Sequence, residues 1–163
     1  MGADQRQLTQ VTPAECSDAF ALAALEIQRH REHGCVGEPG FLDRYADAWL
    51  AERERRPSWL AKTLDGRPVS AVMLHLVSPL PKPGRVGRPW AHLTTLYVSR
   101  DARRSGVGES LVHAALDWCS DRHVLWIQLS SNVTAAGLYR RAGFRPVGDR
   151  LLYLAPHERL TPP

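Results

Sequence analysis

The stretch Arg103-Arg104-Ser105-Gly106-Val107-Gly108 lies between an apolar run, Leu93 to Val98, and an amphipathic segment, Val107 to Cys119. This order predicts a strand, a glycine loop and a helix. Such a loop presents unpaired backbone N–H groups and the start of a helix to a bound phosphate. The glycines leave the backbone open to a phosphate oxygen, and the arginines can donate charge-assisted hydrogen bonds. The loop therefore predicts a site for the diphosphate of a nucleotide-like ligand; a surface turn with two exposed arginines is the alternative.

The helix after this loop is supported by apolar spacing, because one helical stripe contains Val107, Leu111, Ala114, Ala115 and Trp118. The loop itself matches neither of the two common nucleotide-binding patterns. It lacks the Gly-x-x-x-x-Gly-Lys-Ser/Thr of a P-loop and the Gly-x-Gly-x-x-Gly of a dinucleotide-binding fold. The sequence therefore argues against both of those classes.

A second motif follows the helix and one further strand: Asn132-Val133-Thr134-Ala135-Ala136-Gly137-Leu138-Tyr139, and then Gly143-Phe144. With it the chain resembles the GNAT superfamily of N-acetyltransferases. That family carries Arg/Gln-x-x-Gly-x-Gly/Ala, a helix, a strand, and Asn-x-x-Ala-x-x-Leu-Tyr-x-x-x-Gly-Phe. The positions that match are Arg103, Gly106, Gly108, Asn132, Ala135, Leu138, Tyr139, Gly143 and Phe144. The close resemblance runs from Leu93 to Val147, about a third of the chain.

The resemblance implies a mixed α/β fold in one domain, residues 1–163 with a core of about 6–155. The expected sheet is mixed, has six to seven strands with helices on both faces, and splays between strands 4 and 5. The sequence pattern predicts strands at 6–11, 59–64, 69–77, 90–98, 124–129 and 150–155. It predicts four helices, the first opened by a capping box at Thr12-Pro13-Ala14-Glu15 with one face formed by Cys16, Ala19, Phe20, Ala23, Ala24 and Ile27.

The same resemblance implies acetyl-CoA as co-substrate in the splay. The arm of the cofactor would pair with the fourth strand at Leu96, Tyr97 and Val98. The diphosphate would meet Arg103, Arg104, Ser105, Gly106, Val107 and Gly108. Asn132 would contact the pantetheine arm, and Tyr139 would face the sulfur. Some motif residues also have structural explanations, since Asn132 can cap a helix and Gly143 can end one.

The implied reaction moves an acyl group, usually acetyl, to an amine. An ammonium must first lose a proton, and the oxyanion formed by the attack needs a fixed N–H donor, which the resemblance assigns to the backbone of Val98. Tyr139 is the expected acid for the leaving thiolate, because the pKa of a phenol is close to that of a thiol.

His92 is the candidate general base, because a histidine is half neutral near pH 6.5. It lies eleven residues before Arg103, in an Ala91-His92-Leu93 context similar to that of the arylalkylamine acetyltransferases. Those enzymes carry a second histidine where this chain has Thr94, so we do not infer their substrate. A histidine without a role, and His75, Glu26 or Glu54 as the base, are the alternatives.

The composition of the chain limits its domain count, its metal sites and its cellular location. The chain has 163 residues, the size of one domain, and 44% hydrophobic residues. Its apolar runs are too short for a membrane span, and Met1 to Gln10 is too polar for a signal peptide. Cys16, Cys35 and Cys119 form no Cys-x-x-Cys pair. We therefore expect reduced thiols, no metal site, no membrane and a cytoplasmic location.

The net charge of +4 suits either an anionic cofactor or nucleic acid. Arginines gather beside both motifs, at 100–104 and 140–145, which favours the cofactor. The expected partner is a small-molecule or peptide amine, with a homodimer left open. A catalytically silent acyl-CoA-binding sensor and a basic nucleic-acid-binding domain are the rival functions. The proline-rich loop 78–89 is interpreted either as a substrate-side wall or as an ordinary surface excursion.

Overall fold

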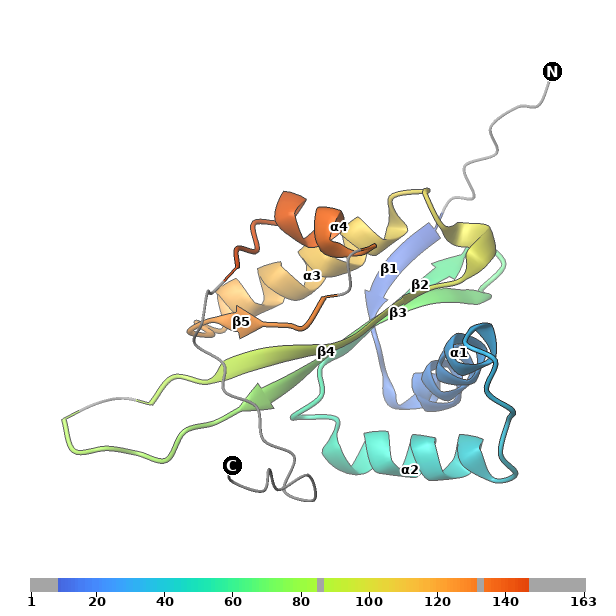
Figure 1. Cartoon of the computed structure of the whole chain (residues 1–163). Helices are drawn as coiled ribbons and strands as arrows, with labels where there is room; N and C mark the ends of the chain where they lie inside the picture. Colours follow the sequence, from blue (N-terminus) through green and yellow to red (C-terminus); the bar gives the residue numbers. More distant parts are fainter. Residues whose placement is uncertain (1–8, 85–86, 132–133, 147–163) are drawn as a thin grey trace, which may run out of the picture.

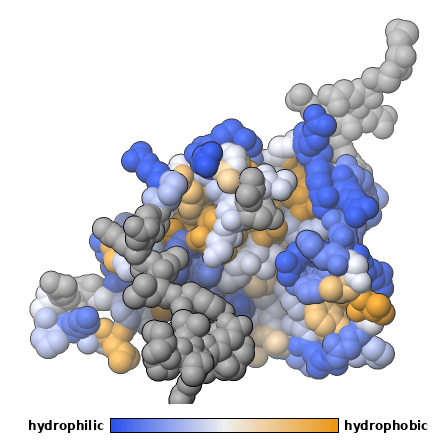
Figure 2. Space-filling view, in the orientation of Figure 1, coloured by the Kyte–Doolittle hydropathy of each residue, from blue (hydrophilic) through white to orange (hydrophobic). Residues whose placement is uncertain are grey.

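The computed structural model describes residues 9–84, 87–131 and 134–146, and it contains one mixed sheet with helices on both faces (Figure 1). The elements in chain order are β1 (Thr9–Pro13), η1 (Cys16–Asp18), α1 (Ala19–Glu32), α2 (Phe41–Glu52), β2 (Ser58–Thr63), β3 (Pro68–Val77), β4 (Trp90–Val98), η2 (Arg100–Ala102), α3 (Val107–Asp121), β5 (Ile127–Gln128) and α4 (Ala136–Arg141). The visible face is largely hydrophilic, with smaller hydrophobic areas among the polar residues (Figure 2).

The sheet has the order β1-β2-β3-β4-β5, with β1 to β4 antiparallel and β5 parallel to β4. This confirms the mixed fold class. The described residues contain five strands rather than six to seven. The expected strand at 124–129 is reduced to Ile127–Gln128, because the chain leaves the sheet after two residue pairs. The expected strand at 150–155 lies outside the described residues.

Each face of the sheet buries its own apolar cluster. On one face Val72, Leu74 and Leu93 pack with Leu111 and Val112 of α3. On the other face Leu60, Ala71 and Met73 pack with residues of α1 and α2, including Leu22, Leu25 and Trp49. Because β2 and β3 are covered on both sides, successive residues of both strands are buried, and the sequence of β3 is largely apolar rather than alternating.

The edge of β4 shows the separation of strands 4 and 5 that the resemblance implied. Its parallel pairing with β5 is limited to Ala91 with Ile127 and His92 with Gln128. Just beyond, β4 carries an extra residue, Thr94, because Met73 of β3 opposes Thr95 while Leu74 opposes Leu93. Such a bulge bends a strand and increases its twist. From residue 93 to residue 98, β4 therefore presents a backbone edge that β5 does not cover.

Two details of the N-terminal region differ from the expectation. Thr12 and Pro13 belong to β1, where they pair with β2, so they do not start the helix. The capping box forms three residues later, and the backbone N–H of Glu15 donates to Asp18 at 3.0 Å. The buried face of α1 is also rotated, because α2 covers one flank: Leu22 and Leu25 are buried, whereas Phe20 is 56% exposed.

Candidate cofactor cavity

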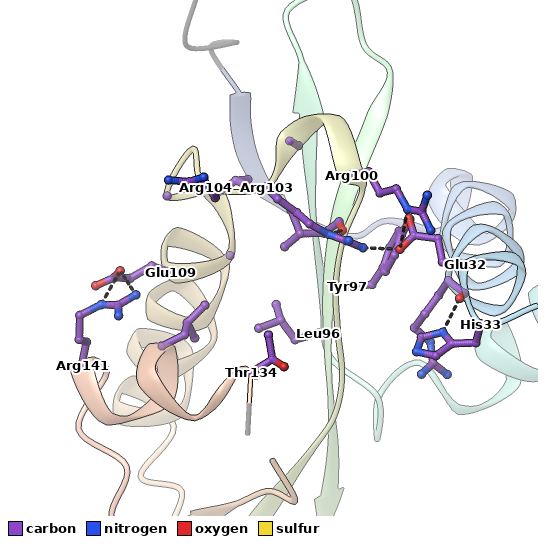
Figure 3. Close-up of a pocket in the computed structure, with 18 residues that line it drawn as sticks. Glu32, His33, Leu96, Tyr97, Arg100, Arg103, Arg104, Glu109, Thr134 and Arg141 are labelled. Atoms are coloured by element: carbon purple, nitrogen blue, oxygen red, sulfur yellow. Dashed lines mark hydrogen bonds and ion pairs between the residues drawn. The ribbon is translucent and has the colours of Figure 1, made fainter. Parts of the chain in front are cut away.

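A cavity of about 760 Å³ lies between the free edge of β4, the glycine loop, the first turn of α3, helix α4 and the end of α1 (Figure 3). This volume is within the usual range of ligand pockets. Eight residues predicted to bind the cofactor line it: Leu96, Tyr97, Val98, Arg103, Arg104, Gly106, Val107 and Gly108. The structure therefore brings the strand and the loop together around one cavity, and their contact with a ligand stays a prediction.

The glycine loop and the first turn of α3 supply backbone N–H groups along the wall of this cavity. Arg104 and Gly106 both have left-handed backbone, with φ of 65° and 87°. The first hydrogen bond within α3 joins the N–H of Ser110 to the carbonyl of Gly106 at 3.1 Å, so the N–H groups of Val107, Gly108 and Glu109 have no partner inside the helix. A helix start of this kind attracts phosphate through its N–H groups and its dipole.

Ser105 has a different place from its neighbours in the loop. Its hydroxyl donates to the carbonyl of Ala102 at 2.6 Å, and the residue is outside the cavity lining. This bond fixes the turn between η2 and α3. Ser105 therefore supports the shape of the loop, and direct contact with a ligand stays a prediction.

The surroundings of Gly108 give a different reason for glycine at this position than the sequence suggested. A Cβ at this position would lie 3.2 Å from Cγ2 of Val98 and 3.3 Å from Cδ1 of Leu138. The missing side chain thus allows α3 to pack closely against β4 and α4, rather than making room for a phosphate oxygen. At Gly106, by contrast, a Cβ would meet nothing within 4 Å, so its requirement for glycine comes from the backbone conformation.

The backbone of β4 offers donors along the same cavity. The N–H of Ser99 donates to the carbonyl of Val69 at 2.9 Å, which points Ser99 toward β3. Backbone direction alternates along a strand, so the N–H groups of Val98 and Leu96 point away from β3 and toward the splay. Both residues line the cavity. The edge is therefore able to pair with an extended amide-containing ligand arm.

Positive charge predominates around the cavity. Its lining contains five arginines, 29, 100, 103, 104 and 141, against the carboxylates of Glu32 and Glu109. Arg141 pairs with Glu109 at 3.2 Å. Within the described part of the chain, Arg104 forms no ion pair with a side chain. The excess of cations suits a polyanionic ligand, with Arg104 the cation most available to it.

The carboxylate of Glu32 is the main feature of the cavity that sequence reasoning missed. It accepts hydrogen bonds from the Tyr97 hydroxyl at 2.7 Å and from the Arg103 guanidinium. Burial alone would raise the pKa of Glu32, but these two donors outweigh burial and hold it below its usual value. Burial first, and the Glu32 carboxylate second, raise the pKa of Tyr97. No local motif marks Glu32, because its partners lie at least 65 residues away.

The predicted acid, Tyr139, is a core residue next to the cavity. It is 8% exposed, and its ring packs edge-on against Phe144 with centroids 5.7 Å apart. Burial raises the pKa of Tyr139, which keeps its phenol protonated. Its neighbour Leu138 lines the cavity, whereas Tyr139 does not. Its contact with a ligand stays a prediction, and the predicted partner Asn132 lies outside the described residues.

The predicted base, His92, lies where β4 and β5 separate. It is half-buried and stands directly opposite His75 of β3 and beside Gln128 of β5. Ala91 and Leu93 face the α3 cluster, so alternation places His92 on the face of α1 and α2. His92 is outside the cavity lining. Of the other candidates, Glu26 already pairs with Arg29 at 2.5 Å.

Metal ligands do not gather in the described part of the chain. No three His, Cys, Asp or Glu side chains among those residues lie closely enough to hold a metal ion. No helix in the described ranges combines the length and the apolar composition needed to cross a membrane.

Comparison with known proteins gives a consistent picture. A model of the acetyltransferase (GNAT) family matches residues 22–144. No curated protein sequence matches the chain. A predicted acetyltransferase from Clostridium acetobutylicum, solved with acetyl-CoA, is 13% identical with a TM-score of 0.74, over 91% of this chain and 96% of that one.

Two further solved structures share the fold. A ribosomal-protein-alanine N-acetyltransferase from Brucella melitensis biovar Abortus 2308 is 20% identical, with a TM-score of 0.68 over 91% of this chain and 98% of that one. The aminoglycoside antibiotic 6'-N-acetyltransferase AAC(6')-Ih from Acinetobacter baumannii is 18% identical, with a TM-score of 0.67 over 91% and 97%. At these identities the likeness concerns the fold alone.

Proposed function

Because the chain belongs to the acetyltransferase (GNAT) family, we propose that it transfers an acetyl group from acetyl-CoA to a primary amine of a small molecule or peptide, by direct attack in a ternary complex. The observation that carries this proposal is the cavity that joins the amides of the glycine loop to the free edge of β4. An extended ligand with a diphosphate at one end fits both parts.

The residues present fit such a ligand. The N–H groups of Val107, Gly108 and Glu109 would hold the diphosphate, with Arg104 adding charge. The N–H groups of Leu96 and Val98 would pair with the pantetheine arm. When bound, acetyl-CoA supplies an activated acyl group as a thioester. Alignment of this arm along β4 would bring its reactive end toward the splay at His92.

Two side chains would then carry the chemistry. The N–H of Val98 would pair with the arm beside the diphosphate loop, at the end of β4 away from His92, so we do not propose it as the donor to the oxygen on which negative charge develops. Tyr139 would give a proton to the departing sulfur. His92 would accept the proton that the acceptor ammonium must lose before it can attack. Because His92 lies on the sheet face covered by α1 and α2, we propose that the acceptor amine approaches from that face.

The test is a panel of primary amines incubated with acetyl-CoA, with free thiol measured as the product. We expect thiol release that depends on at least one amine and saturates with both substrates. If CoA binds but no amine promotes thiol release, a silent acyl-CoA-binding module is the better account. Steeply salt-dependent binding of polynucleotide that CoA does not affect would instead favour the nucleic-acid-binding alternative.

A further inference from the structure

Glu32 ends helix α1 on the side of the cavity opposite α4 (Figure 3). Its side chain is only 14% exposed and has three partners from the β4 region. The hydroxyl of Tyr97 donates to Oε1 at 2.7 Å, the Arg103 guanidinium binds Oε2, and Nε of Arg100 lies 3.7 Å from Oε2. One carboxylate thus connects α1 to β4, to η2 and to the first residue of the glycine loop.

The side chain of Arg103 is held at two points. Its Nε donates to the carbonyl of Val98 at 3.1 Å, and its Nη2 donates to Glu32. A planar guanidinium with two bonded nitrogens has little remaining freedom. It therefore spans from the loop across the end of β4 to α1, and it occupies the Val98 carbonyl while leaving the Val98 N–H for another partner.

We propose that Glu32 is a positioning residue for the cofactor: by fixing Arg103 across the end of β4, it sets the diphosphate-binding loop and the Val98 N–H in their binding arrangement. This inference rests on the proposed function, since it takes CoA as the ligand of the cavity. The Arg103 side chain then links the glycine loop, β4 and α1. The positive charge that faces the phosphates comes from Arg104 and the loop amides.

A purely electrostatic role for Glu32 predicts a change of CoA affinity in the opposite direction when the carboxylate is removed. A carboxylate beside a polyanion repels it, so loss of that charge alone would tighten CoA binding. Loss of the Glu32–Arg103 bond would weaken CoA binding, because Arg103 would no longer hold the loop. Charge-assisted hydrogen bonds contribute more free energy than charge repulsion that solvent and salt screen. We therefore expect the net effect of removing the Glu32 charge to be weaker CoA binding.

The experiment is calorimetric titration of CoA into the wild type, Glu32→Gln, Arg103→Lys and the double variant. Each single change should raise the Kd about tenfold, equivalent to ~1.4 kcal/mol. Arg103→Lys keeps the charge but cannot make both contacts. The double variant should bind CoA no more weakly than either single variant, because both changes break the same Glu32–Arg103 bond. Glu38→Gln, which removes an exposed pair with Arg44 outside the cavity, should leave the Kd unchanged.

A second readout needs no ligand. The Nε–Hε signal of Arg103 in a nitrogen–proton NMR spectrum, assigned by its loss in Arg103→Lys, should shift and exchange faster with water in Glu32→Gln. Unchanged or tighter CoA binding by folded Glu32→Gln overturns the proposal while leaving the proposed function standing. Absence of CoA binding by the wild type is a failure of the proposed function itself. If Glu32→Gln does not fold, Glu32→Asp, which keeps the charge but shortens the side chain, decides the question by the same Kd criterion.

Discussion

Gly106 has the strictest conformational requirement in the cofactor loop. Its φ of 87° is unfavourable for any residue with a Cβ, although the space around it is open. We predict that Gly106→Ala destabilises the fold by about 1 kcal/mol and raises the Kd for CoA about tenfold, because the loop amides would rotate. Urea denaturation and calorimetry measure the two effects.

Gly66 provides a matched control for that change. It has φ of 85° in the turn between β2 and β3, a Cβ there would also meet nothing within 4 Å, and it is outside the cavity lining. Gly66→Ala should cost similar stability and leave CoA affinity unchanged. Equal losses of affinity in both variants would mean that strain, rather than loop geometry, explains the effect of Gly106→Ala.

Tyr139→Phe separates chemistry from packing. The substitution keeps the ring that packs on Phe144 and removes the hydroxyl. We predict a fall in kcat of about ten- to a hundredfold with a nearly unchanged Kd for CoA and an unchanged Tm. Because burial raises the pKa of Tyr139, the wild type should lose no activity through tyrosine ionisation until the pH exceeds about 10. An unaltered kcat would leave Tyr139 with a packing role only.

His92→Ala should show its effect through the pH profile. We predict that kcat falls about a hundredfold at pH 7 and much less near pH 10, where free amine is already abundant. Steady-state rates between pH 6 and pH 10 test this, with His113→Ala as control, since His113 is exposed on α3. A profile of unchanged shape would remove His92 from the base role.

At the scale of elements, Asp18 links η1 to β2. Its carboxylate accepts from Lys62 at 2.6 Å and from the backbone of Glu15. Burial opposes ionisation of Asp18, but these donors outweigh it and lower its pKa below the usual value. A lowered pKa in the folded state stabilises the fold above the unfolded pKa, and this stabilisation is lost as the pH falls through the folded value.

We therefore predict that Asp18→Asn lowers the free energy of unfolding by about 1 kcal/mol at pH 7, and that the difference shrinks as the pH falls below about 4. Urea denaturation at several pH values measures it. Asp47→Asn, at an exposed position of α2, is the control and should have little effect. A difference that grows toward low pH would contradict this role of Asp18.

Elements were predictable where local pattern decides them. The bounds of β4 match the expected 90–98, and α3 begins at Val107 as its apolar stripe indicates. The start of α1 was misplaced because pairing with β2 draws Thr12 and Pro13 into β1. That pairing joins residues about fifty positions apart, which a local pattern cannot encode.

The same distinction explains what was predictable in the site. The glycine loop and Val98 were found because their motif is contiguous. Glu32 and Arg29 were missed because helix α1 reaches the cavity only through the tertiary fold. The role of Gly108 was misread for a related reason, since its close neighbours, Val98 and Leu138, come from other elements.

At the scale of the whole molecule, the cavity is assembled from α1, β4, α3 and α4, so a ligand there should stabilise the folded state as a unit. At a CoA concentration a hundred times the Kd, linkage predicts about 2.7 kcal/mol of added stability. For a chain of this size that corresponds to a rise in Tm of about 5–10 °C. Thermal denaturation with and without CoA measures it, and an unchanged Tm under saturating CoA would contradict the assembled site.

The most direct test of the central claim is isothermal titration of CoA into the folded wild-type protein. The glycine loop and the free edge of β4 predict one site per chain, with binding that weakens as salt is added because the diphosphate is held by charge. Absence of heat with both CoA and acetyl-CoA, from protein shown to be folded by circular dichroism, would contradict the claim.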